Sequence, residues 1–295
     1  MLITWKYRER DTIIQRLDPR ARIIFMLAML ISIIQFWDLR IVLGFLALAL
    51  AQYFLARLTW RETRRAWLLI SILITLMTIL TFLTGRGGVE YAYFEEHLIT
   101  RLGPLSLPIV GWQIGLDITV EKTVFAVSQM ARMFAITALA VTVPYTIDPS
   151  LYGVTFRGLG LPDKFAYAMD LAFRFVPTLG RDFSITLDSQ RARGYEVEKL
   201  EGGIIAQIRK LAPLIVPVTI NAIVSGEDII DAMDLRCFGI GKRTWLQKLE
   251  YKKADWALIA FGLAMFVGCT VVRVAFPALG YVWVPQWILN LATMG

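Results

Sequence analysis

Residues 23–56 read IIFMLAMLISIIQFW-DLR-IVLGFLALALAQYFLA, two apolar runs joined by Asp38-Leu39-Arg40. A helix needs about 20 apolar residues to cross a bilayer, with a range of roughly 17–25. Each run is slightly short, but Arg22 and Arg57 at the outer ends can lay their aliphatic stems along the helix and keep their charges in water. The stretch therefore predicts a tight hairpin of two transmembrane helices.

Further apolar runs follow this hairpin, and 57% of the 295 residues are hydrophobic. Soluble domains are roughly 45–50% apolar, and here the excess lies in uninterrupted runs. The sequence therefore predicts a multi-pass membrane protein. Its further spans are expected at 66–84, 119–144 and 256–272, and the tail 281–292 is either a sixth span or an interfacial segment.

The charged residues orient these spans, because positively charged loops of membrane proteins stay in the cytoplasm. Lysines and arginines gather in residues 1–22 and 57–65. We expect both segments in the cytoplasm, and residues 85–117 outside as a long loop. No cleavable signal is expected at the start. The net charge of +7 then reflects topology and anionic lipid headgroups rather than nucleic acid.

Residues 146–253 are too polar to span a bilayer and too apolar to be freely soluble. Apolar residues recur every three or four positions in Lys164–Arg193, which predicts an amphipathic helix. A second helix is expected over Ile204–Arg236, kinked at its prolines. The expected fold is an all-α polytopic membrane protein with about five to six transmembrane helices and long cytoplasmic amphipathic helices. Its expected parts are 1–145 with four spans, 146–253 with the amphipathic helices, and 254–295 with a final span and an apolar tail.

Two short arginine motifs close these amphipathic helices, SQRARGY at 189–195 and AMDLRCFG at 232–239. A cation at a helix C-terminus is stabilised by the helix dipole by about 0.3–1 kcal/mol, which accounts for a single arginine. Two such ends beside small residues instead favour docking, because a guanidinium pairs in bidentate fashion with carboxylates in a partner's groove. Gly194 stands where a glycine with positive φ ends a helix.

The sequence contains few of the residues that catalysis or metal binding requires. His97 is the single histidine, Cys237 and Cys269 are the two cysteines, and no G-x-x-x-x-G-K-[ST] phosphate loop occurs. We expect no catalytic residue and no metal site. Arg132 lies within the fourth expected span, where a charge is costly and tends to be functional. Structural pairing with Glu121 or a loop acid is an equal alternative.

Several stretches resemble one known family, the transmembrane T component of energy-coupling factor transporters, which includes cobalt and biotin permeases. The resemblance covers about Gln15–Val272. The second arginine motif departs from the family's usual Ala-Arg-Gly, since Leu235 and Cys237 flank Arg236. The matching stretches are RLDPRAR at 16–22, LYG at 151–153, GLP at 160–162, RFVP at 174–177, Asp182 and QRARG at 190–194.

The resemblance implies a scaffold that binds no cofactor itself. It links two cytoplasmic ABC-type ATPases, which use ATP and Mg²⁺, to a small membrane S component that binds a vitamin or metal ion. It also implies a multi-pass protein of the prokaryotic inner membrane with a cytoplasmic N-terminus. The implied ATPase-docking residues are Ala192, Arg193, Gly194, Leu235, Arg236 and Cys237, supported by Arg174, Pro177, Asp182, Gln190 and Arg191. The apolar side expected to face the S component contains Phe165, Met169, Phe173, Leu211, Leu214 and Val218.

Two other functions remain open from the residues alone. An intramembrane enzyme is motivated by Arg132 and by the acidic residues Asp231 and Asp234. A conventional permease would bind its substrate within the spans, but few polar side chains converge there.

Overall fold

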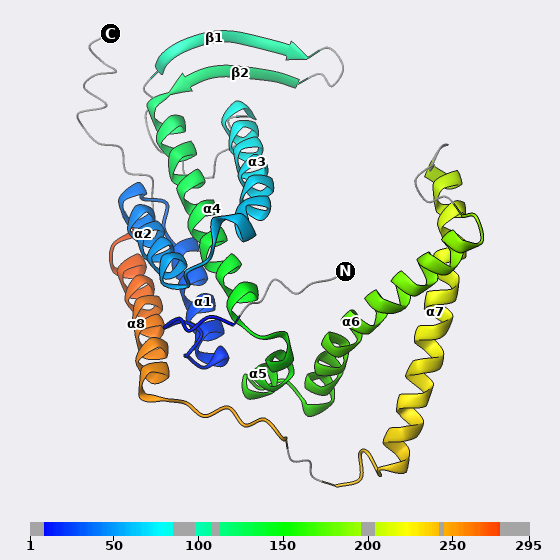
Figure 1. The fold of residues 1–295 in the computed structure, drawn as a ribbon. Helices are drawn as coiled ribbons and strands as arrows, with labels where there is room; N and C mark the ends of the chain where they lie inside the picture. Colours follow the sequence, from blue (N-terminus) through cyan, green and yellow to red (C-terminus); the bar gives the residue numbers. More distant parts are fainter. Residues whose placement is uncertain (1–8, 85–97, 108–111, 196–203, 242–244, 278–295) are drawn as a thin grey trace. The chain divides into compact units, whose positions relative to one another are not determined.

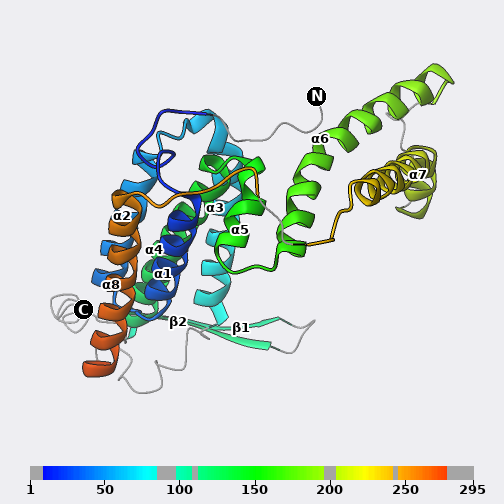
Figure 2. The same ribbon diagram turned by 90° about the horizontal axis from the view of Figure 1, so that it is seen from below.

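The structure is a computed structural model that describes residues 9–84, 98–107, 112–195, 204–241 and 245–277 (Figures 1 and 2). The chain divides into two units. The first, here called the bundle unit, takes in the described parts of Tyr7–Asp148 and Glu250–Gly295. The second, the arm unit, takes in the described part of Pro149–Leu249.

The bundle unit consists mainly of helices around a small apolar core. Helix α2 packs on α4, α1 packs on α8, and α3 packs on α4. The core is centred on Met29, Ile33 and Phe36 of the α1 segment, with Phe45 of α2 and Leu139 of α4. The helices are α1 (Pro19–Ile34), α2 (Leu39–Leu55), α3 (Trp60–Thr84), α4 (Val120–Thr146) and α8 (Lys253–Ala275).

The two helices of the predicted hairpin are confirmed, with α1 starting earlier than its apolar run, but they do not pack tightly on each other: α1 packs mainly on α8, and α2 on α4. Asp18 accepts a hydrogen bond from the Arg20 N–H at 2.8 Å, and Pro19 occupies the first helical position, where its missing N–H costs nothing. Asp38 caps α2 in the same way through the Arg40 N–H at 2.9 Å. The polar triplet at 38–40 therefore starts α2, whereas α1 already ends at Ile34.

Three helices of the bundle unit, α3, α4 and α8, are long and apolar enough to cross a membrane, whereas α1 and α2 have 16 and 17 residues. The prediction of a helical, multi-pass membrane protein is confirmed. In the arm unit, Leu211–Leu235 also has the length and composition of a span. The sequence instead predicts this stretch outside the membrane.

A two-stranded antiparallel sheet is the exception to the all-α prediction. Strand β1 (Leu98–Leu107) pairs with β2 (Trp112–Thr119), within the segment predicted as a long loop. The loop prediction was wrong here because it overlooked a period of two: WQIGLDIT alternates apolar and polar residues, as strands do. Residues 85–97 and 108–111, and the tail 281–292, lie outside the described residues.

The arm unit begins with a 3-10 turn at Pro149–Leu151 and α5 (Tyr152–Gly158), followed by α6 (Asp163–Ala192) and α7 (Ile204–Leu235). Both predicted amphipathic helices are thus confirmed within a few residues. Helix α5 lies very close to α6: a Cβ added at Gly153 would be 2.7 Å from the Ala166 carbonyl oxygen and 2.8 Å from the Asp170 Cβ. Glycine at this position therefore fixes how α5 supports α6.

Candidate functional site

The C-terminal end of α6 has the geometry of a Schellman motif. The Tyr195 N–H donates to the Gln190 carbonyl at 3.0 Å, and the Gly194 N–H donates to the Arg191 carbonyl at 2.9 Å. Gly194 has φ +84°, a left-handed conformation that glycine adopts without strain. Arg193 is consequently the last residue before the chain reverses, at the negative pole of the helix.

The C-terminal end of α7 repeats this geometry although its sequence differs. The Phe238 N–H donates to the Met233 carbonyl and the Cys237 N–H to the Asp234 carbonyl, both at 2.9 Å. Cys237 takes the place of Gly194 and has φ +53°. A left-handed conformation costs a residue with a Cβ about 1–2 kcal/mol. Arg236 thus occupies the same capping position as Arg193, at a cost that glycine would avoid.

We call Ala192–Gly194 and Leu235–Cys237 the two arginine tips. All six of their residues are exposed, and the side chain of Leu235 is 87% accessible. Among the described residues, no ion pair involves the guanidinium of Arg193 or Arg236. Each tip therefore presents a cation and a small or apolar side chain at a helix end, the combination that suits a partner's acidic groove.

Contacts between α6 and α7 hold the tips at opposite ends of the arm unit. The rings of Tyr167 and Phe238 lie 4.7 Å apart, and the Tyr167 hydroxyl donates to the Met233 sulfur at 3.2 Å. The start of α6 therefore contacts the end of α7. Between Tyr167 and Arg193, α6 rises by about 40 Å at 1.5 Å per residue, which sets the approximate separation of the tips.

The other end of α6 contacts the proline-rich start of α7. Pro217 has no N–H to give to the carbonyl of Pro213, four residues earlier in the same helix. The Gln190 side-chain amide donates to this carbonyl at 3.2 Å. Gln190, predicted only as a supporting residue, thus satisfies a backbone carbonyl that Pro217 leaves without its usual helical donor.

The remaining supporting residues lie along α6. Arg174 pairs with Asp170 at 3.1 Å across one helical turn, and Arg191 lies 3.7 Å from Asp188. Pro177 lies inside the helix, which continues through it, and Asp182 is partly buried. These residues belong to one helix but do not form a single cluster with the tips.

The six apolar residues predicted to face an S component do not form one exposed surface. Phe165 is exposed, whereas Phe173 stacks on Tyr152 with ring centroids 4.9 Å apart. Leu214 is only 1% exposed, so it is a core residue of this chain rather than part of an interface. Met169, Leu211 and Val218 are partly buried.

A different apolar stripe is exposed on α7. It consists of side chains within residues 215–224 that are each at least 50% accessible, and their spacing places them within one half of the helix circumference. The sequence predicts an apolar segment here but does not indicate which side of the helix is exposed. The stripe comprises Ile215, Val216, Ile220, Ile223 and Val224.

The side chain of Arg132 is buried against the turn between α1 and α2. Its side chain is 5% exposed, donates to the Phe36 carbonyl at 2.7 Å and lies 3.6 Å from the centre of the Trp37 ring. Ser128 donates to the Trp37 carbonyl at 2.9 Å. Both side chains of α4 thus bind the turn that ends α1, which removes the main motive for an intramembrane enzyme. The side chain of Glu121 lies outside the description.

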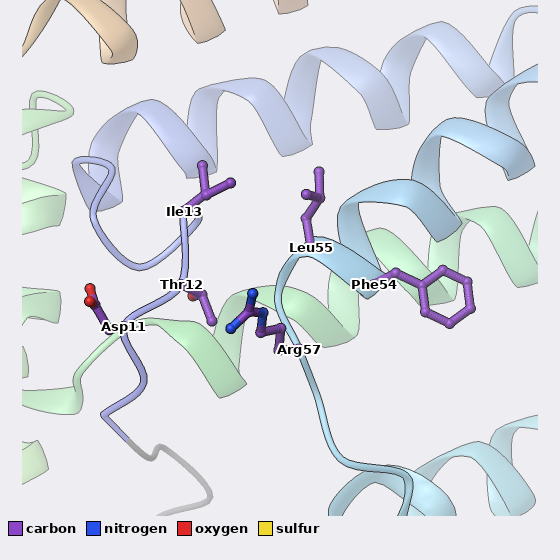
Figure 3. Close-up of a pocket in the computed structure, with 6 residues that line it drawn as sticks. All are labelled: Asp11, Thr12, Ile13, Phe54, Leu55 and Arg57. Carbon is purple, nitrogen blue, oxygen red and sulfur yellow. The ribbon is translucent and has the colours of Figure 1, made fainter.

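No group of three or more His, Cys, Asp or Glu side chains that could hold a metal ion occurs in the described part of the chain. A small open pocket of about 260 Å³ lies in the bundle unit (Figure 3). It contains none of the predicted site residues. Its lining is Asp11, Thr12, Ile13, Phe54, Leu55 and Arg57.

A known protein family matches most of this chain. The family described as cobalt transport protein, CbiQ, matches residues 10–246, which include both arginine tips. The chain belongs to this family. It is a T component of the energy-coupling factor class, as the resemblance implied. The energy-coupling factor transporter transmembrane protein of Thermosediminibacter oceani is 27% identical over 263 residues, 88% of this chain and 93% of that protein.

Two further relatives support this assignment. The transmembrane protein of the same name from Acidaminococcus fermentans is 25% identical over 92% of this chain and 97% of its own length. A putative ABC transporter ATP-binding protein of Bifidobacterium longum is 27% identical over 79% of this chain, but the match spans 29% of that protein. A segment similar to this T component is therefore part of a longer polypeptide in that organism.

Proposed function

We propose that this T component is a non-catalytic coupling subunit whose arginine tips dock into two cytoplasmic ABC-type ATPases. The observation that carries the proposal is the identical capping geometry of Arg193 and Arg236. Two helices of unrelated sequence both end with an exposed arginine at the same position of the same motif. A solvated helix end needs no such repetition, whereas two equivalent partner grooves do.

The separation of the tips also supports two partner molecules. A distance of about 40 Å along α6 is too long for one helix-binding groove and matches the scale of a small domain. The Bifidobacterium relative adds support from another direction, because its name describes an ATP-binding protein. In this proposal ATP and Mg²⁺ are bound by the ATPases, and this chain binds neither.

We assign the exposed α7 stripe, together with Phe165, to the S component. An exposed apolar surface of this kind on a membrane-associated protein fits an apolar partner better than water. The second half of α7 also carries Glu227, Asp228, Asp231 and Asp234, and α6 is amphipathic. We therefore place both helices at the cytoplasmic boundary of a prokaryotic inner membrane, with the N-terminus inside. The S component selects the cargo, a vitamin or a metal ion, and the family's description favours cobalt.

Replacing both tip arginines tests the docking proposal. The variant Arg193→Ala/Arg236→Ala is co-expressed with the two ATPases and the S component, and ATPase co-purification and substrate uptake are measured. Both are expected to fall strongly, because removing one partner of an interfacial charge pair commonly costs about 2–5 kcal/mol. Arg181→Ala is the matched control, since Arg181 is an exposed arginine in the middle of α6. Unchanged co-purification of the double variant would overturn the proposal.

A further inference from the structure

Within the described residues, the chain passes between its two units twice, at Asp148/Pro149 and at Leu249/Glu250. On the bundle side, the first crossing directly follows the end of α4 at Thr146, and the second directly precedes the start of α8 at Lys253. Along the described backbone, a movement passed between the units enters the bundle at these two places. Both are bound by the same short segment, residues 18–22 in the RLDPRAR stretch.

Arg22 binds the first crossing. Its guanidinium donates to the Thr146 carbonyl at 3.0 Å, and the side chain is 5% exposed. The last four carbonyls of a helix have no partner within the helix, and the end of a helix attracts cations. Arg22 therefore fixes the last residue of α4 two positions before the chain leaves the bundle.

Asp255 binds the second crossing. The side chain of this residue is completely buried. One carboxylate oxygen accepts the Asp18 N–H at 2.8 Å, and the other accepts the Lys252 N–H at 2.7 Å. A single buried carboxylate thus joins the start of α1 to the start of α8, and both helix N-termini favour its negative charge.

Arg20 adds a second link at this crossing. Its guanidinium lies 3.9 Å from the centre of the Tyr251 ring. The same group forms an ion pair with the Asp18 carboxylate at 2.8 Å, and this hydrogen bond raises the pKa of Arg20. Tyr251 is the second residue of the bundle after the crossing, so Arg20 fixes the chain where it enters.

We propose that residues 18–22 form a clamp that holds both crossings to the first turn of α1, and that Arg20, Arg22 and Asp255 are positioning residues for energy coupling. Five helical residues rise only about 6 Å, so the two crossings are fixed to nearly one point. Movement of the arm unit is then delivered to α1, α4 and α8 together. The inference rests on the proposed coupling function.

The test separates assembly from coupling. Arg22→Gln and Asp255→Asn are each examined in the full transporter for ATPase co-purification, ATP hydrolysis and uptake. Co-purification and hydrolysis are expected to stay near the wild-type level, while uptake per ATP hydrolysed falls by about fivefold or more. Arg22→Lys, which keeps a donor for the Thr146 carbonyl, is expected to restore part of the coupling.

The RLDPRAR stretch itself supplies a matched control. Arg16 pairs with Asp11 in an exposed ion pair at 2.6 Å, and its side chain is 67% accessible. It contacts neither crossing in the described residues, so Arg16→Gln is expected to couple normally. Should Arg22→Gln reduce the yield of folded protein, Arg20→Gln carries the same test, because it leaves the hydrogen bonds of Arg22 and Asp255 in place.

A distance measurement gives a readout that does not depend on transport. Spin labels are placed at Thr178 on α6 and Arg61 on α3 after both native cysteines have been replaced. The distribution of distances is expected to broaden in the clamp variants and to stay unchanged in Arg16→Gln. Normal coupling together with an unchanged distribution would overturn the clamp proposal. The docking proposal is tested separately by the tip variants: loss of ATPase co-purification supports it, and retention overturns it.

Discussion

Replacing Gly153 by alanine is expected to destabilise the arm unit at the contact between α5 and α6. The new Cβ would be 2.7 Å from the backbone oxygen of Ala166, and an ordinary contact needs at least 3.4 Å. The two helices would have to separate by about 0.7 Å, and overpacking of this kind costs about 1–3 kcal/mol. The higher helix propensity of alanine offsets up to about 1 kcal/mol of this cost. The net expectation is a loss of about 1–2 kcal/mol.

Hydrogen exchange measures this local loss directly. The amides of α5 and the first half of α6 are expected to exchange about 5–30 times faster in Gly153→Ala, because exchange follows the free energy of local opening. Gly226→Ala on α7 is the control: its added Cβ meets nothing within 4 Å, so exchange in α7 should stay equal or become slower. Equal protection of α5 in the wild type and in Gly153→Ala would refute the close-contact argument.

Three further substitutions test single contacts. Cys237→Gly should raise the free energy of unfolding of the α7 end by about 0.5–1 kcal/mol, because the relief of left-handed strain exceeds the entropy cost of glycine. Hydrogen exchange of the Phe238 amide measures this gain. Equal protection of that amide in Cys237→Gly and Cys237→Ala would contradict it. Gln190→Ala should lower the free energy of local opening around Pro213 by only about 1 kcal/mol or less, because water can replace the lost donor at this exposed site. Unchanged amide exchange in this region would show that the Gln190 hydrogen bond contributes nothing. Arg132→Met should lower the free energy of unfolding of the detergent-solubilised protein by about 1–3 kcal/mol, because it leaves the buried Phe36 carbonyl without this donor. Normal stability together with abolished uptake would instead indicate a direct functional role for Arg132.

The helices were largely predictable because their signals are local. Asp18 and Asp38 cap helices that the apolar runs already indicate, and Gly194 marks the end of α6. The end of α7 was harder to predict. Cys237 lacks the signal of a left-handed residue, yet it adopts φ +53° because the two Schellman hydrogen bonds and the packing of Phe238 on Tyr167 hold it there.

The features that the sequence did not reveal depend on tertiary contacts. Hydropathy gives Leu214 and Ile215 similar weight, and it is their packing that makes one buried and the other exposed. The partner of Arg132 is a backbone carbonyl 96 positions away, a group that carries no sequence signal. The clamp residues were visible only as part of a family resemblance, since the sequence does not show that Asp18 meets Asp255.

Site-specific photo-crosslinking at the arginine tips tests the central claim most directly. A photoreactive amino acid is placed at Ala192 or at Leu235, both exposed next to a tip arginine, in the assembled transporter in native membranes. The account predicts that each position crosslinks to an ATPase subunit, and that the same probe at the exposed Thr178 in the middle of α6 does not. Crosslinks from both tips to this chain itself or to lipid, with none to an ATPase, would contradict it.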